Sequence, residues 1–276
     1  MKPIRLIFLA SLVASPLSWA AAADDYVSDP VSGCRIATDD PNSTDDVASW
    51  TGACKGGLAS GVGTLTWMRA GALYGRYEGA MKNGKLNGIG VLHFSAKDGG
   101  FDRIAGKFTD GELDGSGHVK NANGDSFRGQ FKNGLRHGVG LYTEADGSTY
   151  EGEFANGLPH GSGHSIAEKG DEYVGEFQAG KRHGDGFLNK SDGDYYIGEF
   201  RNGVAHGQGY YGASDGGIFA GAFANGDPNG MGTYTAPNGE VTQGRFTDGK
   251  PDGLILVTLK DGSQSTELWK SGEEVK

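Results

Sequence analysis

Residues 150–163 read YEGEFANGLPHGSG, and this stretch decides the fold because its pattern recurs along most of the chain. The pattern is an aromatic residue, a glycine two residues later, a phenylalanine two residues after that, an Asn-Gly pair and a closing Gly-x-Gly. A period of about 20–50 residues is typical of solenoids and other repeat arrays. The first glycine recurs at two steps of 27 and then six steps of 23 residues, at Gly52, Gly79, Gly106, Gly129, Gly152, Gly175, Gly198, Gly221 and Gly244.

Each copy is predicted to form a β-hairpin. Pairs such as Asn156-Gly157 supply the positive φ angles that tight hairpin turns require. A second strand is expected to begin at the Gly-x-Gly, and a turn such as Asp146-Gly147 would link it to the next copy. The aromatic residue, the glycine and the phenylalanine alternate by two, so they share one face of the strand. Stacked hairpins would line these rings into two continuous rows, with side chains from neighbouring strands lying over the glycine gap.

The composition favours such a repeat over an ordinary globular core. Glycine supplies 51 of 276 residues and only 36% of residues are hydrophobic, while 10% are aromatic, which is high for a disordered chain. One hairpin cannot bury its apolar face alone, so stability must come from stacking. We therefore predict an all-β fold: an elongated single-layer solenoid of about nine tandem β-hairpins over residues 50–253. Residues 24–49 and residues 254–276, which contain a half repeat around Trp269, are expected to cap the two sheet ends.

The first 23 residues have the features of a secretory signal peptide. Lys2 and Arg5 precede an apolar run from Leu6 to Val13, and small residues suited to cleavage follow. We therefore expect the protein to be exported, either to the periplasm or to the medium; a retained N-terminal anchor is the alternative. Without Lys2 and Arg5, 23 basic residues face 35 acidic ones, a formal charge of 23 − 35 = −12. A surface of that sign disfavours nucleic acid and anionic lipid as partners.

The chain has two cysteines, Cys34 and Cys54. Export makes a disulfide between them plausible, and the alternative is two small buried thiols. The bridge would close a loop of about 20 residues and stabilise the fold by about 3 kcal/mol.

The repeat resembles the MORN repeat (membrane occupation and recognition nexus), whose motif is close to Tyr-x-Gly-x-Phe-x-x-Gly-x-x-x-Gly-x-Gly at a 23-residue step. The resemblance covers about residues 50–272 and is tightest from Phe127 to Gly209. Cys54 replaces the phenylalanine of the first copy, and Ile255 replaces the last glycine of the final copy. The resemblance implies an elongated single sheet of hairpins, with roles in protein scaffolding, homodimerisation or lipid association.

Two polar columns accompany the repeat. A histidine lies eight residues after the first glycine in four copies, at His137, His160, His183 and His206. Equivalent residues would lie two strands apart, about 9.5 Å, whereas zinc ligands lie about 2 Å from their metal. A turn or strand-start position with a local hydrogen bond is therefore favoured over a metal or proton-relay ladder. The second column follows the first glycine and is predicted to be a solvated face opposite the aromatic residues, at Glu153, Glu176 and Glu199.

No catalytic, cofactor-binding or metal-binding residue is predicted, because identical residues in a column do not form the unlike, closely held groups that catalysis needs. We predict a non-catalytic scaffold that binds a protein partner or a second copy of itself; the alternative is a module that binds membrane lipid or cell-envelope glycan. A glycan hydrolase would need a cleft with paired carboxylates, which a single-layer ribbon hardly offers. The candidate partner-binding residues, for which packing within the protein is the alternative role, are Tyr142, Tyr150, Tyr173, Tyr196, Tyr211 and Tyr234.

Overall fold

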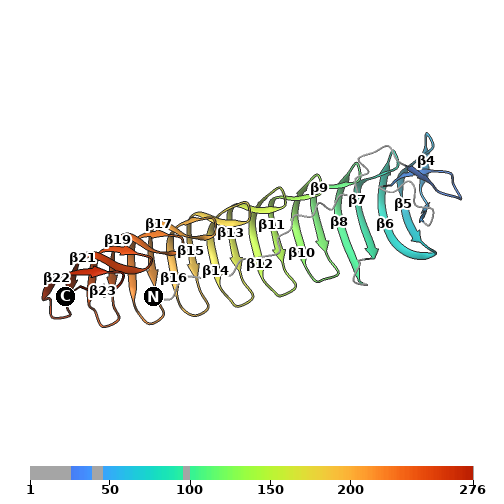
Figure 1. The fold of residues 1–276 in the computed structure, drawn as a ribbon. Helices are drawn as coiled ribbons and strands as arrows, with labels where there is room; N and C mark the ends of the chain where they lie inside the picture. The colour runs from blue at the N-terminus through green and yellow to red at the C-terminus, as the bar shows by residue number, and fades with distance from the viewer. Residues whose placement is uncertain (1–25, 39–45, 96–99, 276) are drawn as a thin grey trace. The chain divides into compact units, whose positions relative to one another are not determined.

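The computed structural model describes residues 26–38, 46–95 and 100–275, so the predicted signal peptide lies outside the described residues. These residues form 23 β-strands in one open sheet and contain no helix, which confirms the predicted all-β fold (Figure 1). The chain divides near Leu158 into an N-terminal and a C-terminal unit, which are described separately.

The N-terminal unit contains the first twelve strands. Most strands pair antiparallel with the strand that follows in the chain, and β2 lies parallel to β5. Their bounds are β1 Tyr26–Ser28, β2 Arg35–Ala37, β3 Asp46–Trp50, β4 Ala53–Lys55, β5 Leu58–Arg69, β6 Ala72–Lys82, β7 Lys85–Ser95, β8 Phe101–Thr109, β9 Glu112–Lys120, β10 Ser126–Lys132, β11 Leu135–Thr143 and β12 Thr149–Ala155.

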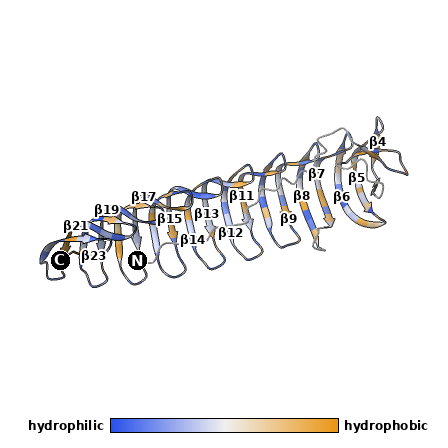
Figure 2. Cartoon of the chain, viewed as in Figure 1, coloured by the Kyte–Doolittle hydropathy of each residue, from blue (hydrophilic) through white to orange (hydrophobic). Residues whose placement is uncertain are grey.

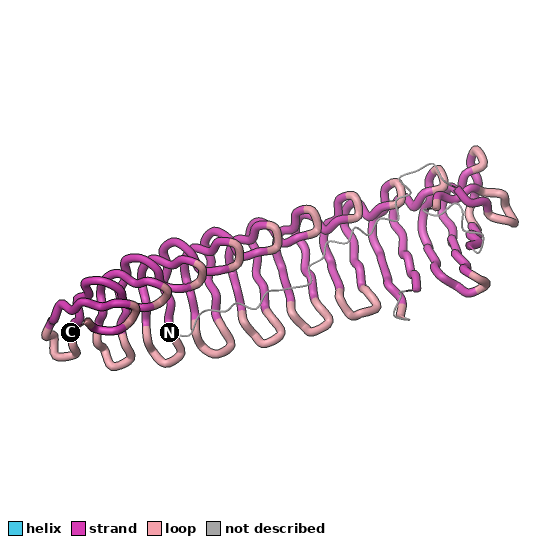
Figure 3. The backbone as a smooth tube through the Cα atoms, in the orientation of Figure 1, coloured by secondary structure: helices cyan, strands magenta, loops and turns pink. Residues whose placement is uncertain are grey.

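The C-terminal unit contains the remaining strands, again with each strand antiparallel to the next. Their bounds are β13 Leu158–Ile166, β14 Glu172–Gln178, β15 Lys181–Asn189, β16 Tyr195–Arg201, β17 Val204–Gly212, β18 Ile218–Ala224, β19 Asp227–Thr235, β20 Val241–Thr247, β21 Lys250–Thr258, β22 Gln264–Lys270 and β23 Glu273–Glu274. Figure 3 shows the short loops that join these strands.

The hairpin turns have the predicted chemistry. Asn202 and Gly203 lie between the paired residues Arg201 and Val204, with φ angles of 53° and 93°. Two positive φ angles in succession define a type I′ turn, whose twist matches that of the flanking strands. The equivalent first turn residue has a φ near 50° throughout, and one copy carries an alanine there, Ala179, with a φ of 49°.

The second strand of each hairpin begins earlier than predicted. Strand β15 starts at Lys181, three residues before Gly184, and His183 pairs with Glu176 inside the ladder. The register shifts between Gly175 and Glu176, which marks a β-bulge. Across the bulge β14 advances by one residue while β15 advances by three, from His183 to Gly186, so two extra residues lie on β15. Sequence spacing alone gives no sign of this local shift.

Opposed glycines form a row through the middle of the C-terminal unit. Gly175 pairs with Gly163 on one side and with Gly186 on the other. A Cβ on Gly175 would lie 2.5 Å from Tyr173 Oη and 2.7 Å from the Cα of Gly186. The Tyr173 ring lies over Gly175 in its own strand and over Gly186 in the neighbouring strand β15, and Ile255 of β21 lies over Gly244. Cover from a neighbouring strand was predicted, and cover from within the same strand is added to it. The row continues through Gly198, Gly209, Gly221, Gly232 and Gly244, and ends at Ile255.

The two aromatic rows that were predicted contact each other in this unit and together form a zigzag. The Tyr173 ring meets Phe177 of its own strand at a centroid distance of 5.1 Å and Phe200 of the next copy at 5.0 Å, both edge to face. Tyr196 repeats this arrangement with Phe200 and Phe223, each at 5.0 Å. Each edge-to-face pair stabilises by about 0.5–1.5 kcal/mol beyond its buried area. Consecutive copies are therefore linked through their rings.

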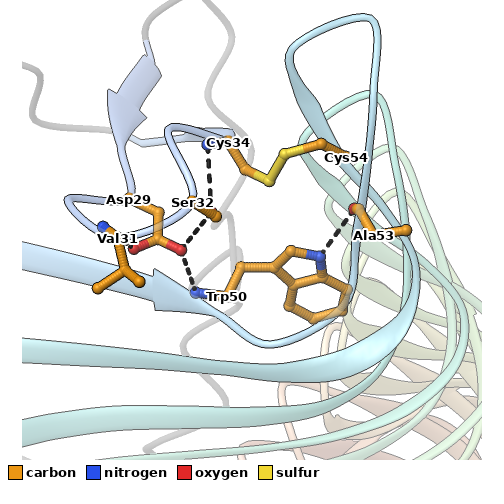
Figure 4. The surroundings of a disulfide bond; sticks show 7 residues. All are labelled: Asp29, Val31, Ser32, Cys34, Trp50, Ala53 and Cys54. Atoms are coloured by element: carbon orange, nitrogen blue, oxygen red, sulfur yellow. Dashed lines mark hydrogen bonds between the residues drawn. A yellow bond between two sulfur atoms is a disulfide. The ribbon is translucent and has the colours of Figure 1, made fainter.

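At the N-terminal end, β1 and β2 dock on the start of the sheet and the predicted disulfide between Cys34 and Cys54 is present (Figure 4). The buried carboxylate of Asp29 accepts hydrogen bonds from Ser32 Oγ, from the Val31 amide at 2.9 Å and from the Trp50 amide at 3.2 Å. Burial opposes the charge of this carboxylate, but the hydrogen bonds outweigh burial and lower the pKa of Asp29. This network ties the first two strands to β3.

Candidate interaction surface

Three of the six tyrosines singled out in the sequence lie in the protein's own core. Tyr150, Tyr173 and Tyr196 are at most 2% exposed. The Tyr196 hydroxyl donates to the carbonyl oxygens of Glu199 at 3.0 Å and His206 at 3.2 Å, so it satisfies polar groups beside the bulge. Packing within the protein is therefore the role that the geometry favours for these three rings.

The other three candidates lie nearer the strand ends. Tyr142 is 8% exposed, while Tyr211 and Tyr234 are half-buried. The Tyr211 hydroxyl donates to Asp194 Oδ2 at 2.6 Å, and burial together with this carboxylate raises the pKa of Tyr211. The structure brings these tyrosines to the aromatic face, and a contact with a partner remains a prediction for them.

A repeated aspartate, which the sequence analysis did not single out, clamps neighbouring loops together. Asp194 Oδ1 accepts the Ser214 amide at 3.0 Å, and Asp171 Oδ1 accepts the Ser191 amide at 2.9 Å. In the N-terminal unit Asp125 accepts from the Ala145 amide at 3.0 Å. All three aspartates precede the first glycine of their copy by four residues, so a column search at that offset finds them.

The histidine column lies within strands and not at turns or strand starts. His183 and His206 are half-buried beside the bulges, where their carbonyl oxygens face tyrosine hydroxyls. The described ranges contain no group of three or more His, Cys, Asp or Glu residues that could hold a metal ion. The local hydrogen bond expected of this position is made by the backbone.

One arginine occupies a core position that is apolar in other copies of the C-terminal unit. The Arg182 guanidinium lies 5.1 Å from the centroid of the Tyr173 ring, and burial lowers the pKa of Arg182. Its Nη1 atom is buried and has no hydrogen-bond partner among the residues that the structure describes. Pro159, Ala205 and Pro228 hold the equivalent place. This cation packs against the Tyr173 ring.

The opposite face of the sheet carries the exposed side chains. Glu153, Glu176 and Glu199 are exposed, as predicted, while the phenylalanine that follows each of them is buried. Apolar residues are exposed on this face too, including Val139 at 64% and Met231 at 69%. Figure 2 shows apolar and polar residues interspersed along the strands. The outward residues therefore form a surface of mixed polarity. They are carried by the glycine row, the aromatic zigzag and the turns, which we call the frame.

Five of these outward residues gather on β14 to β17, and we call them the outer patch: Val174, Phe187, Tyr195, Ile197 and Tyr210. Cross-strand pairs join Val174 to Phe187, Phe187 to Ile197 and Ile197 to Tyr210. The Tyr195 and Tyr210 rings stack at 6.0 Å with an interplanar angle of 27°. Val174 is 48% exposed, Phe187 38% and Ile197 50%.

An acidic row runs beside the outer patch. Glu176, Asp185 and Glu199 lie on the same strands and the same face as the patch, two residues along from Val174, Phe187 and Ile197 respectively. Asp185 is directly opposite Glu199 in the ladder. Like charges in that position destabilise a sheet. None of the three carboxylates makes an ion pair in the part of the chain that the structure describes.

These features define a β-hairpin repeat protein with a buried aromatic face and a variable outer face. The sequence profile of the MORN repeat matches six segments, residues 77–98, 127–149, 150–172, 173–195, 196–218 and 219–241. The chain is therefore a MORN-repeat protein, with six MORN repeats between residues 77 and 241. The hairpins β8–β9 and β20–β21 lie outside the matched segments but keep the same strand pairing.

Other comparisons add little. No curated protein matches the chain. One solved structure with a detectable likeness is the TCP domain of SAS-4 (dCPAP) of Drosophila melanogaster, in complex with a proline-rich motif of Ana2 (dSTIL). The likeness covers 65% of this chain and 90% of that chain, with 10% identity and a TM-score of 0.36, which is too low to support an argument. None of the described residues belongs to a helix long and apolar enough to cross a membrane.

Proposed function

We propose that this protein is an exported, non-catalytic scaffold whose outer face binds a partner protein. The observation that carries this proposal is the contrast between the frame and the outer face. The glycine row, the aromatic zigzag and the turns keep the same residue types from copy to copy. The position ten residues after the first glycine points outward and varies freely, as Ser116, Val139, Ser162, Asp185, Gln208, Met231 and Leu254.

Such a contrast is the pattern expected of a repeat scaffold, in which stacked units create an extended surface that varied side chains make specific. The titratable groups with shifted pKa values support the same proposal. Burial raises the pKa of Tyr77 to about 12, and its hydroxyl donates to the Ala80 carbonyl oxygen at 2.9 Å. Asp29 and Tyr211 are likewise occupied by hydrogen bonds of the fold. These groups hold the sheet together.

In vivo chemical crosslinking tests the proposal. A variant with serine at the outward apolar positions Val139, Ile197 and Met231 should lose a protein partner that the parent chain captures, because the frame stays intact. A matched variant with serine at three outward polar positions should keep that partner. Unchanged capture by the apolar-to-serine variant would count against a protein-binding outer face.

Export and the class of ligand need separate measurements. Deleting residues 1–23 should leave the protein in the cytoplasm if that segment is a signal peptide. Outward carboxylates such as Glu176 and Glu199 disfavour anionic membranes as the ligand. For the ligand, the protein is sedimented with phosphatidylglycerol vesicles or with cell-wall sacculi. Binding to either one, when no protein partner is captured, would favour a lipid- or glycan-binding module over a protein scaffold.

A further inference from the structure

We propose that the outer patch and its acidic row bind an extended, arginine- or lysine-rich segment of the partner protein. This inference rests on the proposed function and names the chemistry of the partner. It uses only the C-terminal unit, where the five patch residues and the three carboxylates share one face of four consecutive strands.

The distance between the apolar row of the outer patch and the acidic row matches the length of an arginine or lysine side chain. Val174, Phe187 and Ile197 are neighbours on adjacent strands, about 4.8 Å apart, and their row crosses the strand direction. The acidic row runs parallel to it, two residues along each strand, which is about 6.7 Å away. Arginine and lysine cover apolar surface with their methylene stems while their charged heads reach a polar region. A stem laid over the apolar row therefore brings its cation to the acidic row.

The exposed rings favour arginine in particular. The Phe187 ring lies 6.5 Å from that of Tyr195, which stacks on Tyr210. A planar guanidinium stacks on aromatic faces and also binds carboxylates in a bidentate manner. Asp185 and Glu199 are directly opposite in the ladder, and the Glu199 carboxylate turns toward β17, where its Oε1 accepts the Gln208 amide at 2.9 Å. Neither carboxylate makes an ion pair among the described residues, so a guanidinium beside them would supply the positive charge that this row lacks.

Charge complementarity also decides between occupants. A second copy of this chain would set carboxylates against carboxylates, and the whole chain has a formal net charge of −10. Anionic ligands are repelled in the same way. A cationic, partly apolar peptide segment is the occupant that satisfies both rows at once.

Fluorescence anisotropy with a defined probe tests this proposal. The probe is a fluorescein-labelled nine-residue peptide that alternates arginine and valine, titrated with the purified protein. We expect saturable binding that weakens as salt is added, because the acidic row is exposed. Peptides with glutamate in place of arginine, or with serine in place of valine, should bind at least about tenfold more weakly, a difference of about 1.4 kcal/mol.

Two variants map the binding to the site. The pair Phe187→Ser and Ile197→Ser should weaken binding at least about tenfold. The pair Glu176→Gln and Asp185→Asn should weaken it and flatten its salt dependence. Matched controls are Leu254→Ser, an outward residue of β21 that is 71% exposed, and Glu240→Gln in the loop before β20; both should keep the parent affinity. Circular dichroism verifies that each variant is folded.

Several outcomes overturn the proposal. Equal affinity of the parent and both variant pairs would place the peptide elsewhere, and equal binding of the arginine–serine peptide would reduce the effect to non-specific charge attraction. The proposed function fails separately. A partner that crosslinks through Val139 or Met231 but not through Ile197 would refute this site and keep the scaffold, whereas absence of a partner at every outward position would refute the scaffold itself.

Discussion

The opposed glycines predict that one added methyl group destabilises the sheet. In Gly186→Ala, the new Cβ would lie 2.5 Å from Cε2 and 2.6 Å from Cζ of Tyr173. Carbon atoms pack best at about 3.5–4.0 Å, so the ring or the backbone would have to move by about 1 Å. The ring has no room to move, because Tyr173 is fully buried and its hydroxyl donates to the Glu176 carbonyl oxygen at 3.0 Å. Overpacking of this kind destabilises by about 1–3 kcal/mol, and we expect the upper end.

A double-mutant cycle measures this contact by urea unfolding followed by circular dichroism. In a Tyr173→Ala background the obstacle is absent, and alanine in a strand is favoured over glycine by about 0.5–1 kcal/mol. Gly186→Ala should therefore become neutral or stabilising, which gives a coupling free energy of about 2 kcal/mol or more. A Tyr173→Phe background is the matched control, because it keeps the ring carbons and should keep the destabilisation.

Two results would refute this reasoning. One is a neutral Gly186→Ala in the parent protein, and the other is an equal loss of stability in all three backgrounds. If Tyr173→Ala unfolds too early for a urea titration, native-state hydrogen exchange of the amides in β14 and β15 gives the same comparison.

Four further predictions address the frame. Tyr196→Phe leaves the Glu199 carbonyl oxygen without its donor and should destabilise by about 1–3 kcal/mol in urea, while Tyr234→Phe should have little effect. Ala179→Asn should stabilise by about 0.5–1 kcal/mol in the same assay, because asparagine tolerates the positive φ that alanine adopts there. Reduction of the disulfide should lower hydrogen-exchange protection in β1 to β5 and remove about 3 kcal/mol, and unchanged protection would contradict its role. The lowered pKa of Asp29 means that its charge stabilises above the unfolded pKa of about 3.9, and that this contribution is lost as the pH falls through the folded value; Asp29→Asn should therefore reduce the acid sensitivity of unfolding measured between about pH 2 and 5.

The frame could be predicted from sequence because its requirements are local and repeated. A turn such as Asn202-Gly203 needs two positive φ angles, and few residues adopt them readily. The period of two then assigns Tyr196 and Phe200 to one face, and both are buried there. Such constraints depend on the residue's own backbone or on the next residues along the strand, so they leave a direct trace in the sequence.

The departures from prediction depend on how the strands pair. Strand β15 begins three residues before Gly184, and its register shifts at the bulge beside Gly175. No residue spacing in the sequence indicates either feature. The covering of Gly175 by the Tyr173 ring of its own strand depends on a side-chain direction that strand alternation does not specify. Sequence left both roles open for the candidate tyrosines, because a period of two tells which residues share a face but not how deeply each ring on that face is buried.

The outer patch could not be found by searching for columns. Its members Val174, Phe187 and Ile197 come from different positions of the repeat and meet only through cross-strand pairing. When the copies of the repeat are aligned with one another, the common pattern records only the positions that keep the same residue type, and the variable positions drop out of it. The variable positions are therefore where sequence periodicity has least power and where a scaffold carries its specificity.

Site-specific photo-crosslinking tests the central claim most directly. A photoreactive phenylalanine analogue is placed in vivo at the outward position Ile197 and, in a second strain, at the control position Glu240, which lies in the loop before β20 and outside the patch. The account predicts that a protein rich in arginine or lysine at the crosslinked segment is trapped from Ile197 and not from Glu240. Trapping of no protein at Ile197 while other outward positions trap one, or trapping of an acidic segment there, would contradict it.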